Sequence, residues 1–368
     1  MKLEKGVISS SQLMLLIISF IQGAHLTMGF ISGIIKHDIW LVVLAALLIS
    51  VPFILIYVTL AQRFPGKNLV QINDSVYGHY LGKFISVLYI LFFLTVAAQN
   101  LIFVGYFLTT FIIPETPIWI IIIMFAFVCS WAVRNGIEVI ARCTFLFVII
   151  TAAAVLLVTL LLLKDMEFTN FLPIFEVSLK DFVQGVHVVS TISFCEIVVF
   201  LMVIPYTNKI KQAKNSILLG LILGAAQLFI IVVRDTAVLG ILESVMASPS
   251  FEVVRLIDIA HIITRLDILI AIVLLVTMFM KVSIFYYATV LGIAQLFKLR
   301  SYVPMVLPIG VIIISYAVLA SGSSAEYNYI AAHVWPMAAL PLEFIIPPLT
   351  LLTAKIRRLP KKQGGEQR

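Results

Sequence analysis

Apolar stretches about 20 residues long recur from one end of the chain to the other, and short polar connections separate them. A stretch of this length crosses the hydrocarbon core of a bilayer as an α-helix. The pattern predicts helices at about 11–35, 38–62, 83–111, 117–133, 138–163, 182–205, 214–240, 260–296, 302–320 and 330–354. It is typical of an all-α polytopic membrane protein with about ten transmembrane helices.

The first and the sixth of these stretches are interrupted halfway along by small and polar residues. The interruptions contain Gly23, Ala24, His25, Thr27 and Gly29 in the first stretch and Ser190, Thr191, Ser193 and Glu196 in the sixth. Breaks at corresponding places in the two halves of a polytopic protein indicate a binding site near the bilayer midplane. Small residues also allow helices to pack closely, and for the glycines alone that alternative stays open.

Five helices in each half have a geometric consequence. An odd number makes the second half begin on the opposite side of the membrane. The halves, residues 1–163 and 182–354, are therefore predicted to be inverted repeats with broken helices 1 and 6. No connection is long enough for a separate soluble domain, so residues 1–368 are expected to form one membrane domain with a basic tail at 355–368.

The composition excludes a soluble globular protein, because 62% of the residues are hydrophobic and only 12% are charged. The three cysteines lie in or beside apolar stretches without metal-ligand spacing, so neither a metal site nor a disulfide framework is expected. The sequence contains no phosphate-binding glycine loop, metal-ligand cluster or nucleophile elbow. We therefore expect no enzyme, no catalytic residue and no cofactor.

Basic residues gather on one side of the predicted topology. If both termini are inside, the cytoplasmic segments contain 18 of the 25 Lys and Arg residues: Lys2, Lys5, Arg63, Lys67, Lys83, Arg134, Arg142, Lys209, Lys211, Lys214, Lys298, Arg300, Lys355, Arg357, Arg358, Lys361, Lys362 and Arg368. This bias predicts that both termini are cytoplasmic. Because the net charge of +7 follows the topology, it does not predict nucleic-acid binding.

Glu196 is the strongest single candidate for a functional residue. A carboxylate at the centre of a transmembrane helix costs at least about 2.5 kcal/mol, so it needs a proton or a partner. Proton coupling and recognition of a ligand amine both fit this requirement. The alternative is a structural hydrogen bond to a neighbouring helix. Ser193 lies about one turn earlier and would share the face of Glu196.

Lys281 and Glu343 are subject to the same energetic argument. Lys281 would pair with Glu196 or Glu343, or would occupy the position where related transporters hold a sodium ion; snorkelling to the interface is its structural alternative. Glu343 lies among Pro336, Pro341, Pro347 and Pro348, which predict kinks and freed carbonyls, so this residue could simply cap broken backbone. Glu196, Lys281 and Glu343 form the predicted set for proton or ion coupling.

The third stretch carries one polar stripe, with Asn100 beside it. A polar stripe in a membrane faces the interior of the bundle, where it lines either a pocket or a helix interface. The stripe comprises Thr95, Gln99, Tyr106 and Thr110. The complete predicted ligand-binding set is Gly23, Ala24, His25, Thr27, Gln99, Asn100, Tyr106, Ser190, Thr191, Ser193, Phe194 and Glu196.

Several segments together resemble the spore germination permease family, the B-subunits of nutrient germinant receptors in endospore-forming bacteria. The resemblance covers nearly the whole chain and rests on QGAHLTMG at 22–29, FPGKNLVQINDSVYGHYLGK at 64–83, CEIVVFLMVIPYTNK at 195–209, FEVVRLIDI at 251–259 and MFMKVSIFYYA at 278–288. The first segment is a variant, because the family usually has a second glycine where this chain has His25 and a proline where it has Gly29.

The resemblance implies the five-plus-five fold of the amino acid–polyamine–organocation superfamily. It also implies a sensor in the inner membrane of the spore that binds a small nutrient, an amino acid above all. Signalling would pass through an A-subunit membrane protein and a C-subunit lipoprotein. Two other functions need the same broken helices and stay open: a proton-coupled amino acid permease working alone, and a channel for water or ions.

Overall fold

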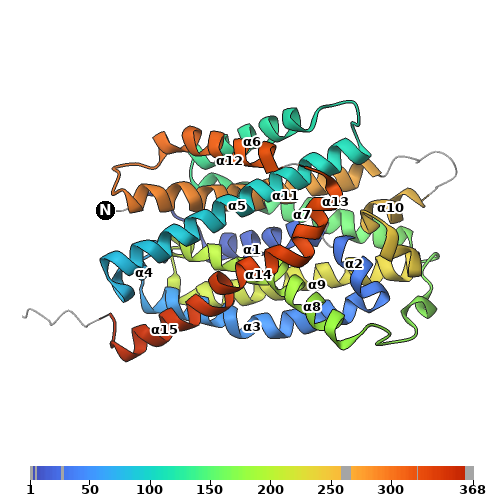
Figure 1. The fold of residues 1–368 in the computed structure, drawn as a ribbon, viewed down its shortest axis with the longest axis horizontal. Helices are drawn as coiled ribbons and strands as arrows, with labels where there is room; N and C mark the ends of the chain where they lie inside the picture. Colours follow the sequence, from blue (N-terminus) through green and yellow to red (C-terminus); the bar gives the residue numbers. More distant parts are fainter. Residues whose placement is uncertain (1–2, 5, 26–28, 258–266, 321, 361–368) are drawn as a thin grey trace, which may run out of the picture.

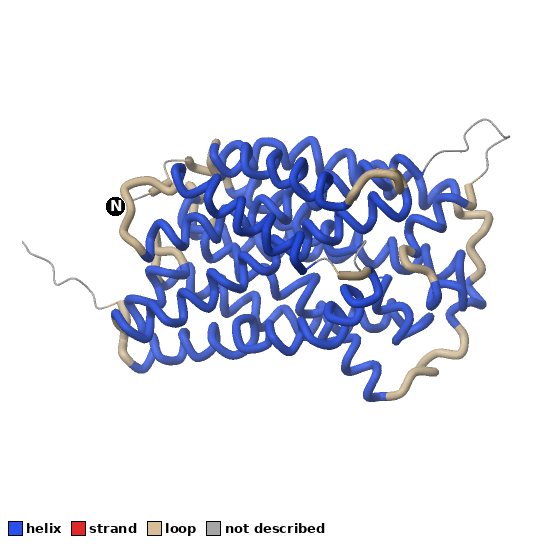
Figure 2. The backbone as a smooth tube through the Cα atoms, turned by 45° about the horizontal axis from the view of Figure 1, so that its top comes forward, coloured by secondary structure: helices blue, strands red, loops and turns tan. Residues whose placement is uncertain are grey.

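The computed structural model describes residues 3–4, 6–25, 29–257, 267–320 and 322–360, in which all regular elements are helical (Figures 1 and 2). The α-helices of the first half are α1 (Ser10–His25), α2 (Gly29–Ile35), α3 (Ile39–Arg63), α4 (Leu69–Tyr77), α5 (His79–Phe111), α6 (Ile118–Arg134) and α7 (Ile137–Leu161). Those of the second half are α8 (Leu179–Val189), α9 (Ala213–Leu239), α10 (Pro249–Arg255), α11 (Asp267–Leu296), α12 (Val306–Ala320), α13 (Ser324–Tyr329), α14 (Trp335–Leu340) and α15 (Ile346–Ile356).

Short π- and 3₁₀-helical turns join or interrupt these helices. The π turns are η4 (Ser190–Phe194), η10 (Ile330–Val334) and η11 (Pro341–Ile345). The 3₁₀ turns are η2 (Lys36–Asp38), η3 (Phe168–Phe171), η5 (Cys195–Met202), η6 (Ile204–Tyr206), η7 (Ile210–Gln212), η8 (Gly240–Val245) and η9 (Val303–Met305). The predicted break in the sixth helix is therefore confirmed, with η4 and η5 at its centre.

The all-α polytopic class is also confirmed. In the described part of the chain, eight helical segments are long and apolar enough to cross a membrane, and shorter apolar helices lie at Ser10–Ala24 and Ile118–Arg134. The first predicted stretch divides into α1 and α2, and the residues between them, 26–28, lie outside the described chain. The total number of crossings and the inverted repeat stay predictions.

Close backbone contact places α1 inside the bundle, against α9. Gly220 and Gly224 of α9 are four residues apart and face α1. A Cβ added at Gly220 would lie 2.8 Å from the carbonyl oxygen of Met14, and one added at Gly224 would lie 3.0 Å from Cβ of Ile21. Two glycines at this spacing are typical of helices that pack tightly in a membrane.

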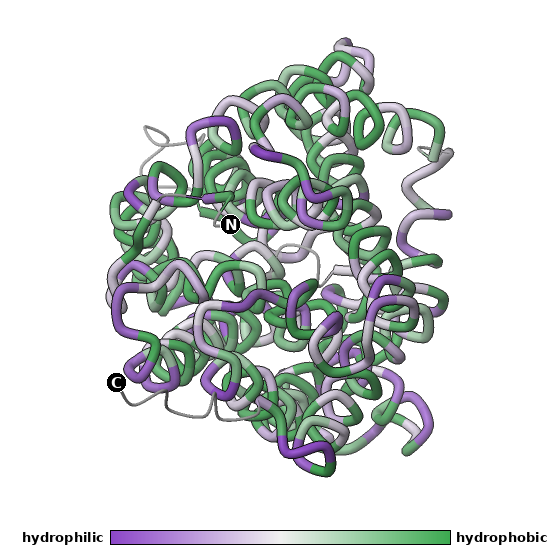
Figure 3. The backbone as a smooth tube through the Cα atoms, turned by 90° about the vertical axis from the view of Figure 1, so that its left-hand side faces the viewer, coloured by the Kyte–Doolittle hydropathy of each residue, from purple (hydrophilic) through white to green (hydrophobic). Residues whose placement is uncertain are grey.

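The segment before α1 lies at the same end of the bundle as α4 and the last turn of α15, on the left of Figure 1. We call this end the terminus end; Figure 3 looks directly at it and shows hydrophilic residues gathered there. Ile8 anchors the segment in both directions: its amide donates to Tyr206 O at 2.9 Å, and its carbonyl accepts from Asn208 N at 2.9 Å.

Glu4 is a second anchor of the same segment. Its buried carboxylate accepts hydrogen bonds from Gly6 N at 2.7 Å, Tyr302 Oη at 3.0 Å and Ile137 N at 3.3 Å. Burial and, next, the negative charge of Glu4 raise the pKa of Tyr206 to about 12, so this phenol keeps its proton at physiological pH. One carboxylate thus ties the start of the chain to α7 and to the connection before α12.

We expect Glu4→Ala to lower the stability of the folded protein by about 2 kcal/mol, because two backbone amides and a phenol lose a charged acceptor. Thermal unfolding in detergent, followed by intrinsic fluorescence, measures the loss. Glu115→Ala is the matched control, because this glutamate is exposed in the turn between α5 and α6. Equal melting temperatures for the two variants would contradict the anchoring role.

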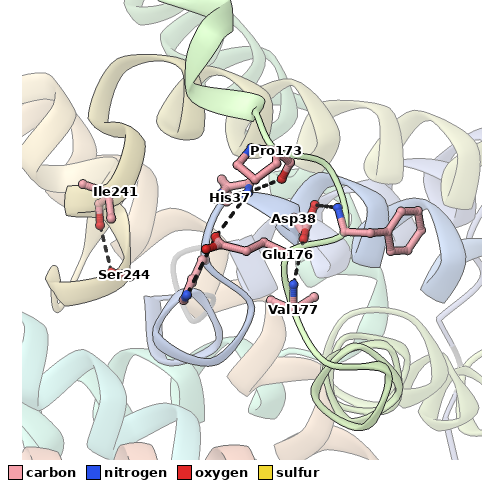
Figure 4. A network of polar contacts seen from close by, with 9 residues as sticks. His37, Asp38, Pro173, Glu176, Val177, Ile241 and Ser244 are labelled. Carbon is pink, nitrogen blue, oxygen red and sulfur yellow. Dashed lines mark hydrogen bonds and ion pairs between the residues drawn. The ribbon is translucent and has the colours of Figure 1, made fainter.

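At the opposite end, the turn between α2 and α3 is clamped by the loop that precedes α8 (Figure 4). Asp38 is fully buried and accepts backbone hydrogen bonds from Phe175 at 3.0 Å and Val177 at 3.5 Å. His37 Nε2 lies 2.6 Å from Pro173 O, which only accepts, so this nitrogen carries the hydrogen. Glu176 lies 3.8 Å from the same nitrogen. The clamp joins the turn after α2 to the loop that leads into α8, where helix 6 begins.

Candidate ligand-binding site

A small cavity inside the bundle is lined by Glu196 and Lys281, two of the three charged residues singled out from the sequence. It has a volume of about 20 Å³, which is room for roughly one water molecule. Described residues from five parts of the chain line it: Phe30, Val96, Gln99, Asn100, Ile192, Glu196, Lys281, Tyr327, Ala331 and Trp335. A much larger hollow of about 1310 Å³ opens at the terminus end beside Glu4 and Tyr206. The small cavity is the candidate ligand-binding site, because two buried charged side chains, Glu196 and Lys281, line it.

Glu196 and Lys281 form an ion pair in the wall of this cavity. Lys281 Nζ lies 2.8 Å from Glu196 Oε2, and the two side chains are only 1% and 3% exposed. The same ammonium donates to Ile192 O at 3.2 Å and lies 5.5 Å from the centre of the Phe20 ring. Two opposite charges in a low-dielectric interior stabilise each other only while they remain together. Glu196 and Lys281 therefore neutralise each other in the wall of the cavity.

The backbone carbonyl that Lys281 reaches lies within the break in helix 6. At the end of η4 the amide of Cys195 is shared between Thr191 O, four residues back, and Ser190 O, five residues back, so the backbone changes to a π turn just before Glu196. The carbonyl of Ile192 then accepts from the lysine ammonium. An irregular backbone at this depth is tolerated where protein groups satisfy it. Here α11 supplies the group.

The last membrane-spanning segment, Ser324–Ile356 (α13, η10, α14, η11 and α15, called helix 10 here), contributes Tyr327, Ala331 and Trp335 to the cavity wall, and Pro336 shapes it. Within η10 the amide of Trp335 bonds to Ile330 O, five residues back. Because Pro336 has no amide hydrogen, Ala332 O is left without its helical donor and accepts from Gln184 Nε2 at 3.5 Å. Trp335 stacks on Phe92 of α5, with ring centres 5.4 Å apart. Tyr327, Ala331 and Trp335 are cavity residues that the predicted ligand-binding set does not contain, although Pro336 is a sequence signal for irregular backbone in this segment.

The polar stripe predicted in the third stretch lies on α5, and only some of its residues line the small cavity. Gln99 and Asn100 line the cavity, and Asn100 Nδ2 also donates to Val96 O at 2.7 Å. Tyr106 lies beyond them, with its ring 5.9 Å from that of Tyr327, and its hydroxyl has no hydrogen-bond partner among the described residues. Both interpretations of the stripe therefore apply, each to different residues.

The small residues of helix 1 lie against Lys281. A Cβ added at Gly23 would come 3.3 Å from Lys281 Cδ and 3.3 Å from Thr277 O, so Gly23 makes room for the lysine stem. Ala24 is fully buried next to it. His25 is the last residue of α1, but its side chain and the whole of Thr27 lie outside the described part of the chain. Their predicted contact with a ligand stays a prediction.

The hydroxyl groups of helix 6 do not gather around the ion pair. Ser190 donates to Ala46 O of α3 at 3.3 Å. Thr191 and Ser193 are fully buried, and their hydroxyls have no hydrogen-bond partner among the described residues. Phe194 belongs to the hydrophobic core. From the break in helix 6, the described cavity is lined by Ile192 and Glu196.

Glu343 lies in η11, and the freed carbonyls predicted there are capped by tyrosines instead of by its carboxyl group. The amide of Ile346 bonds to Pro341 O, and Pro347 and Pro348 have no amide hydrogen. The carbonyls of residues 342 and 343 therefore lack helical donors. They accept instead from Tyr89 Oη and Tyr57 Oη, both at 2.7 Å.

A wider vestibule lies on the side of the cavity away from the terminus end. It measures about 370 Å³ and lies between α2, η8 and helix 10, with Asn328, Tyr329 and His333 in its wall. Phe30 lines both the vestibule and the small cavity. Phe30 is therefore the residue that borders both the vestibule and the cavity lined by the ion pair.

Comparison with known proteins places this site in a family context. A family model described as spore germination protein matches residues 7–324 of the 368-residue chain. The chain belongs to the spore germination protein family. Spore germination protein KB of Bacillus subtilis (strain 168) is 28% identical over 373 residues, with 99% of each chain covered. Spore germination protein YndE of the same organism is 23% identical, with 88% of this chain and 89% of YndE covered.

Solved transporters share the fold of this spore germination family member. Mhp1, a nucleobase-cation-symport-1 family transporter in a closed conformation with bromovinylhydantoin bound, matches with a TM-score of 0.67, covering 94% of this chain and 78% of Mhp1. A Na⁺-coupled sialic acid symporter matches with a TM-score of 0.57, covering 90% and 79%. At 14% and 10% identity these similarities establish the fold alone.

Proposed function

We propose that this family member is the B-subunit of a nutrient germinant receptor and binds a small zwitterionic nutrient, an amino acid above all, between Glu196 and Lys281. The observation that carries the proposal is the buried ion pair in the wall of a small cavity inside the bundle. The family and the named relatives support the role in germination. The chemistry of the pair supports the class of ligand, and no catalytic step is part of this proposal.

A free amino acid matches the two charges of the pair. Its carboxylate would take the place of Glu196 beside the Lys281 ammonium, and its ammonium would take the place of Lys281 beside the Glu196 carboxylate. The net charge of the site would then stay at zero, and no charge would be left unpaired in the low-dielectric interior. A neutral sugar would separate the pair without replacing either partner.

The volume of the cavity implies that binding needs a conformational change. A space for roughly one water molecule does not accommodate an amino acid, so we infer that this structure represents a closed state. The ligand would arrive through the vestibule and displace Phe30 before it reaches the pair. Binding would then favour the open or occluded form over the empty closed form, and this difference in affinity is what a sensor converts into a signal.

Lys281 also bears on cation coupling. The two structural neighbours are described as cation symporters. In this chain the Lys281 ammonium contacts Phe20 of α1, Ile192 of η4 and Glu196 of η5. A fixed positive charge between these helices supplies what a bound cation would supply, so we infer that ligand binding needs no sodium.

The receptor setting follows from the family resemblance and from charge. We propose that an A-subunit membrane protein and a C-subunit lipoprotein receive the signal in the inner membrane of the spore. The terminus end carries Arg63, Lys209 and Lys211, and this basic character supports a cytoplasmic location for both termini.

A binding screen on the purified full-length protein tests the proposal. Calorimetry with free amino acids, their N-acetyl and carboxamide derivatives, sugars and nucleosides, in sodium-free and sodium-containing buffer, distinguishes the ligand classes. We expect free amino acids to bind without sodium, and each derivative that lacks one charge to bind at least tenfold more weakly, about 1.4 kcal/mol. Tight binding of a neutral sugar, with no binding of any amino acid, would show that the ligand class is wrong.

Two further measurements separate the receptor from its alternatives. Accumulation of labelled amino acid in proteoliposomes under a pH gradient would favour a proton-coupled permease. Water or ion flux without a ligand would favour a channel. The presence of genes for A- and C-type subunits next to this one would favour the receptor, and their absence from the whole genome would exclude it.

A further inference from the structure

Glu343 is a buried titratable group that the ligand site does not use. Its side chain is fully buried, and neither carboxyl oxygen has a hydrogen-bond partner among the described residues. It does not line the small cavity as described, although it lies on the same broken helix as Trp335. An ionised carboxylate without a donor in such a place is very costly, so the neutral acid is the form that the site favours.

The surroundings of Glu343 explain why no donor reaches it. The titratable groups that face its carboxyl, from α3, α5, η5 and α11, are Tyr57, Tyr89, Cys195, Glu196 and Lys281. Each tyrosine has one proton, and both protons are already donated to the carbonyls freed by the prolines. Glu196 and Lys281 neutralise each other. The carboxyl group of Glu343 therefore has no counter-charge of its own, because Lys281 is already paired with Glu196, and both phenols near it are engaged.

We propose that Glu343 is a proton-binding site, separate from the Glu196–Lys281 pair, and that its bound proton stabilises the closed conformation. When helix 10 moves and water enters, the O–H bond of the acid breaks and the proton passes to that water. The remaining carboxylate is then solvated by water. Loss of the proton is thus linked to opening, so a rise in pH favours the open form. The bound proton does not depend on the proposed function; only its use in ligand sensing does.

An infrared difference spectrum tests the bound proton without any ligand. Wild-type protein minus Glu343→Gln at neutral pH should show the carbonyl stretch of a protonated carboxylic acid, shifted when the protein is transferred to deuterated water. Glu343→Gln keeps the size and neutrality of the acid, so it is expected to fold. A difference spectrum with only carboxylate bands would overturn the proposal.

The reactivity of Cys195 tests the link to opening. Cys195 is fully buried beside Glu196 and becomes accessible to a membrane-permeant maleimide only when the region opens. In a background with Cys129→Ala and Cys143→Ala, the labelling rate of the Glu343 protein divided by that of its Glu343→Gln counterpart cancels the reactivity of the thiol itself. We expect this ratio to rise roughly tenfold per pH unit while Glu343 is ionised only in the open form.

A ratio that does not change with pH would overturn the proton-linked opening. Neither the infrared nor the labelling measurement uses a nutrient. Failure of the Glu343 proposal is therefore distinguishable from failure of the proposed receptor function. Conversely, a protein that binds no amino acid in the calorimetric screen could still show the infrared band and the pH-dependent ratio.

Discussion

Lys281→Met is expected to destabilise the folded protein by about 3–5 kcal/mol, the usual cost of removing one partner from a buried ion pair. The Glu196 side chain is only 3% exposed, and its carboxylate forms an ion pair with Lys281 at 2.8 Å. Without the ammonium, the Glu196 carboxylate must either take up a proton or reach water through local unfolding, and both cost free energy. Thermal and denaturant unfolding in detergent measure the loss.

Glu196→Gln is expected to cost clearly less, because the two partners differ in their other contacts. Lys281 keeps the Ile192 carbonyl at 3.2 Å and the face of Phe20 when the glutamate becomes an amide. This variant should insert normally into the membrane and still lose ligand response, since the ligand ammonium no longer finds a carboxylate. Equal destabilisation by the two single substitutions would contradict the asymmetry.

The double variant, Glu196→Gln with Lys281→Met, separates stability from binding. Replacing both charges removes the uncompensated charge, so we expect most of the stability lost in Lys281→Met to return. Ligand binding should not return with it. A double variant that binds amino acids as the wild type does would reduce the pair to a structural contact.

The charged residues of the site could be predicted from the sequence because a charge in an apolar helix is energetically exceptional. Glu196 and Lys281 were selected on that basis alone. The choice of partner could not be predicted, since both Glu196 and Glu343 fitted Lys281. The bundle decides it by placing α11 beside the break in helix 6, where Lys281 also meets the Ile192 carbonyl.

Hydrogen bonds between residues far apart in the sequence could not be predicted. Pro347 and Pro348 predicted freed carbonyls in helix 10, but the hydroxyls that cap them come from Tyr57 and Tyr89, 286 and 253 positions away from the carbonyls they reach. Both tyrosines lie in apolar stretches where a phenol has no local signature. Tyr327 and Trp335 could not be predicted as cavity residues for the same reason, because aromatic side chains in apolar stretches carry no local sign of a cavity.

Gly29 shows what a departure from a family pattern means physically. The resemblance to the spore germination permeases implies a proline at this position of the first helix. Here a Cβ at residue 29 would lie 2.5 Å from Ala247 O and 3.0 Å from Pro249 Cδ, in the connection between η8 and α10. Any side chain, a proline ring included, would push this connection away. The connection therefore lies closer to α2 than a larger residue would allow.

Gly29→Ala is consequently expected to shift the equilibrium towards the open state by about 2 kcal/mol, because the nearest obstacle is backbone that cannot rotate aside. That shift corresponds to roughly a 30-fold larger open population. Labelling of Ala331→Cys with a membrane-impermeant maleimide measures it, since Ala331 lines the cavity beyond Phe30.

Gly33→Ala is the matched control for this substitution. It lies on the same short helix, yet its added Cβ would approach only Ser244 O, at 3.3 Å, which a small adjustment accommodates. Labelling that is fast in Gly29→Ala and near wild type in Gly33→Ala would show that the 247–249 connection keeps α2 in the closed position. If both variants label at the wild-type rate, the close approach at Gly29 does not control access to Glu196 and Lys281, and closure must depend on Phe30 alone.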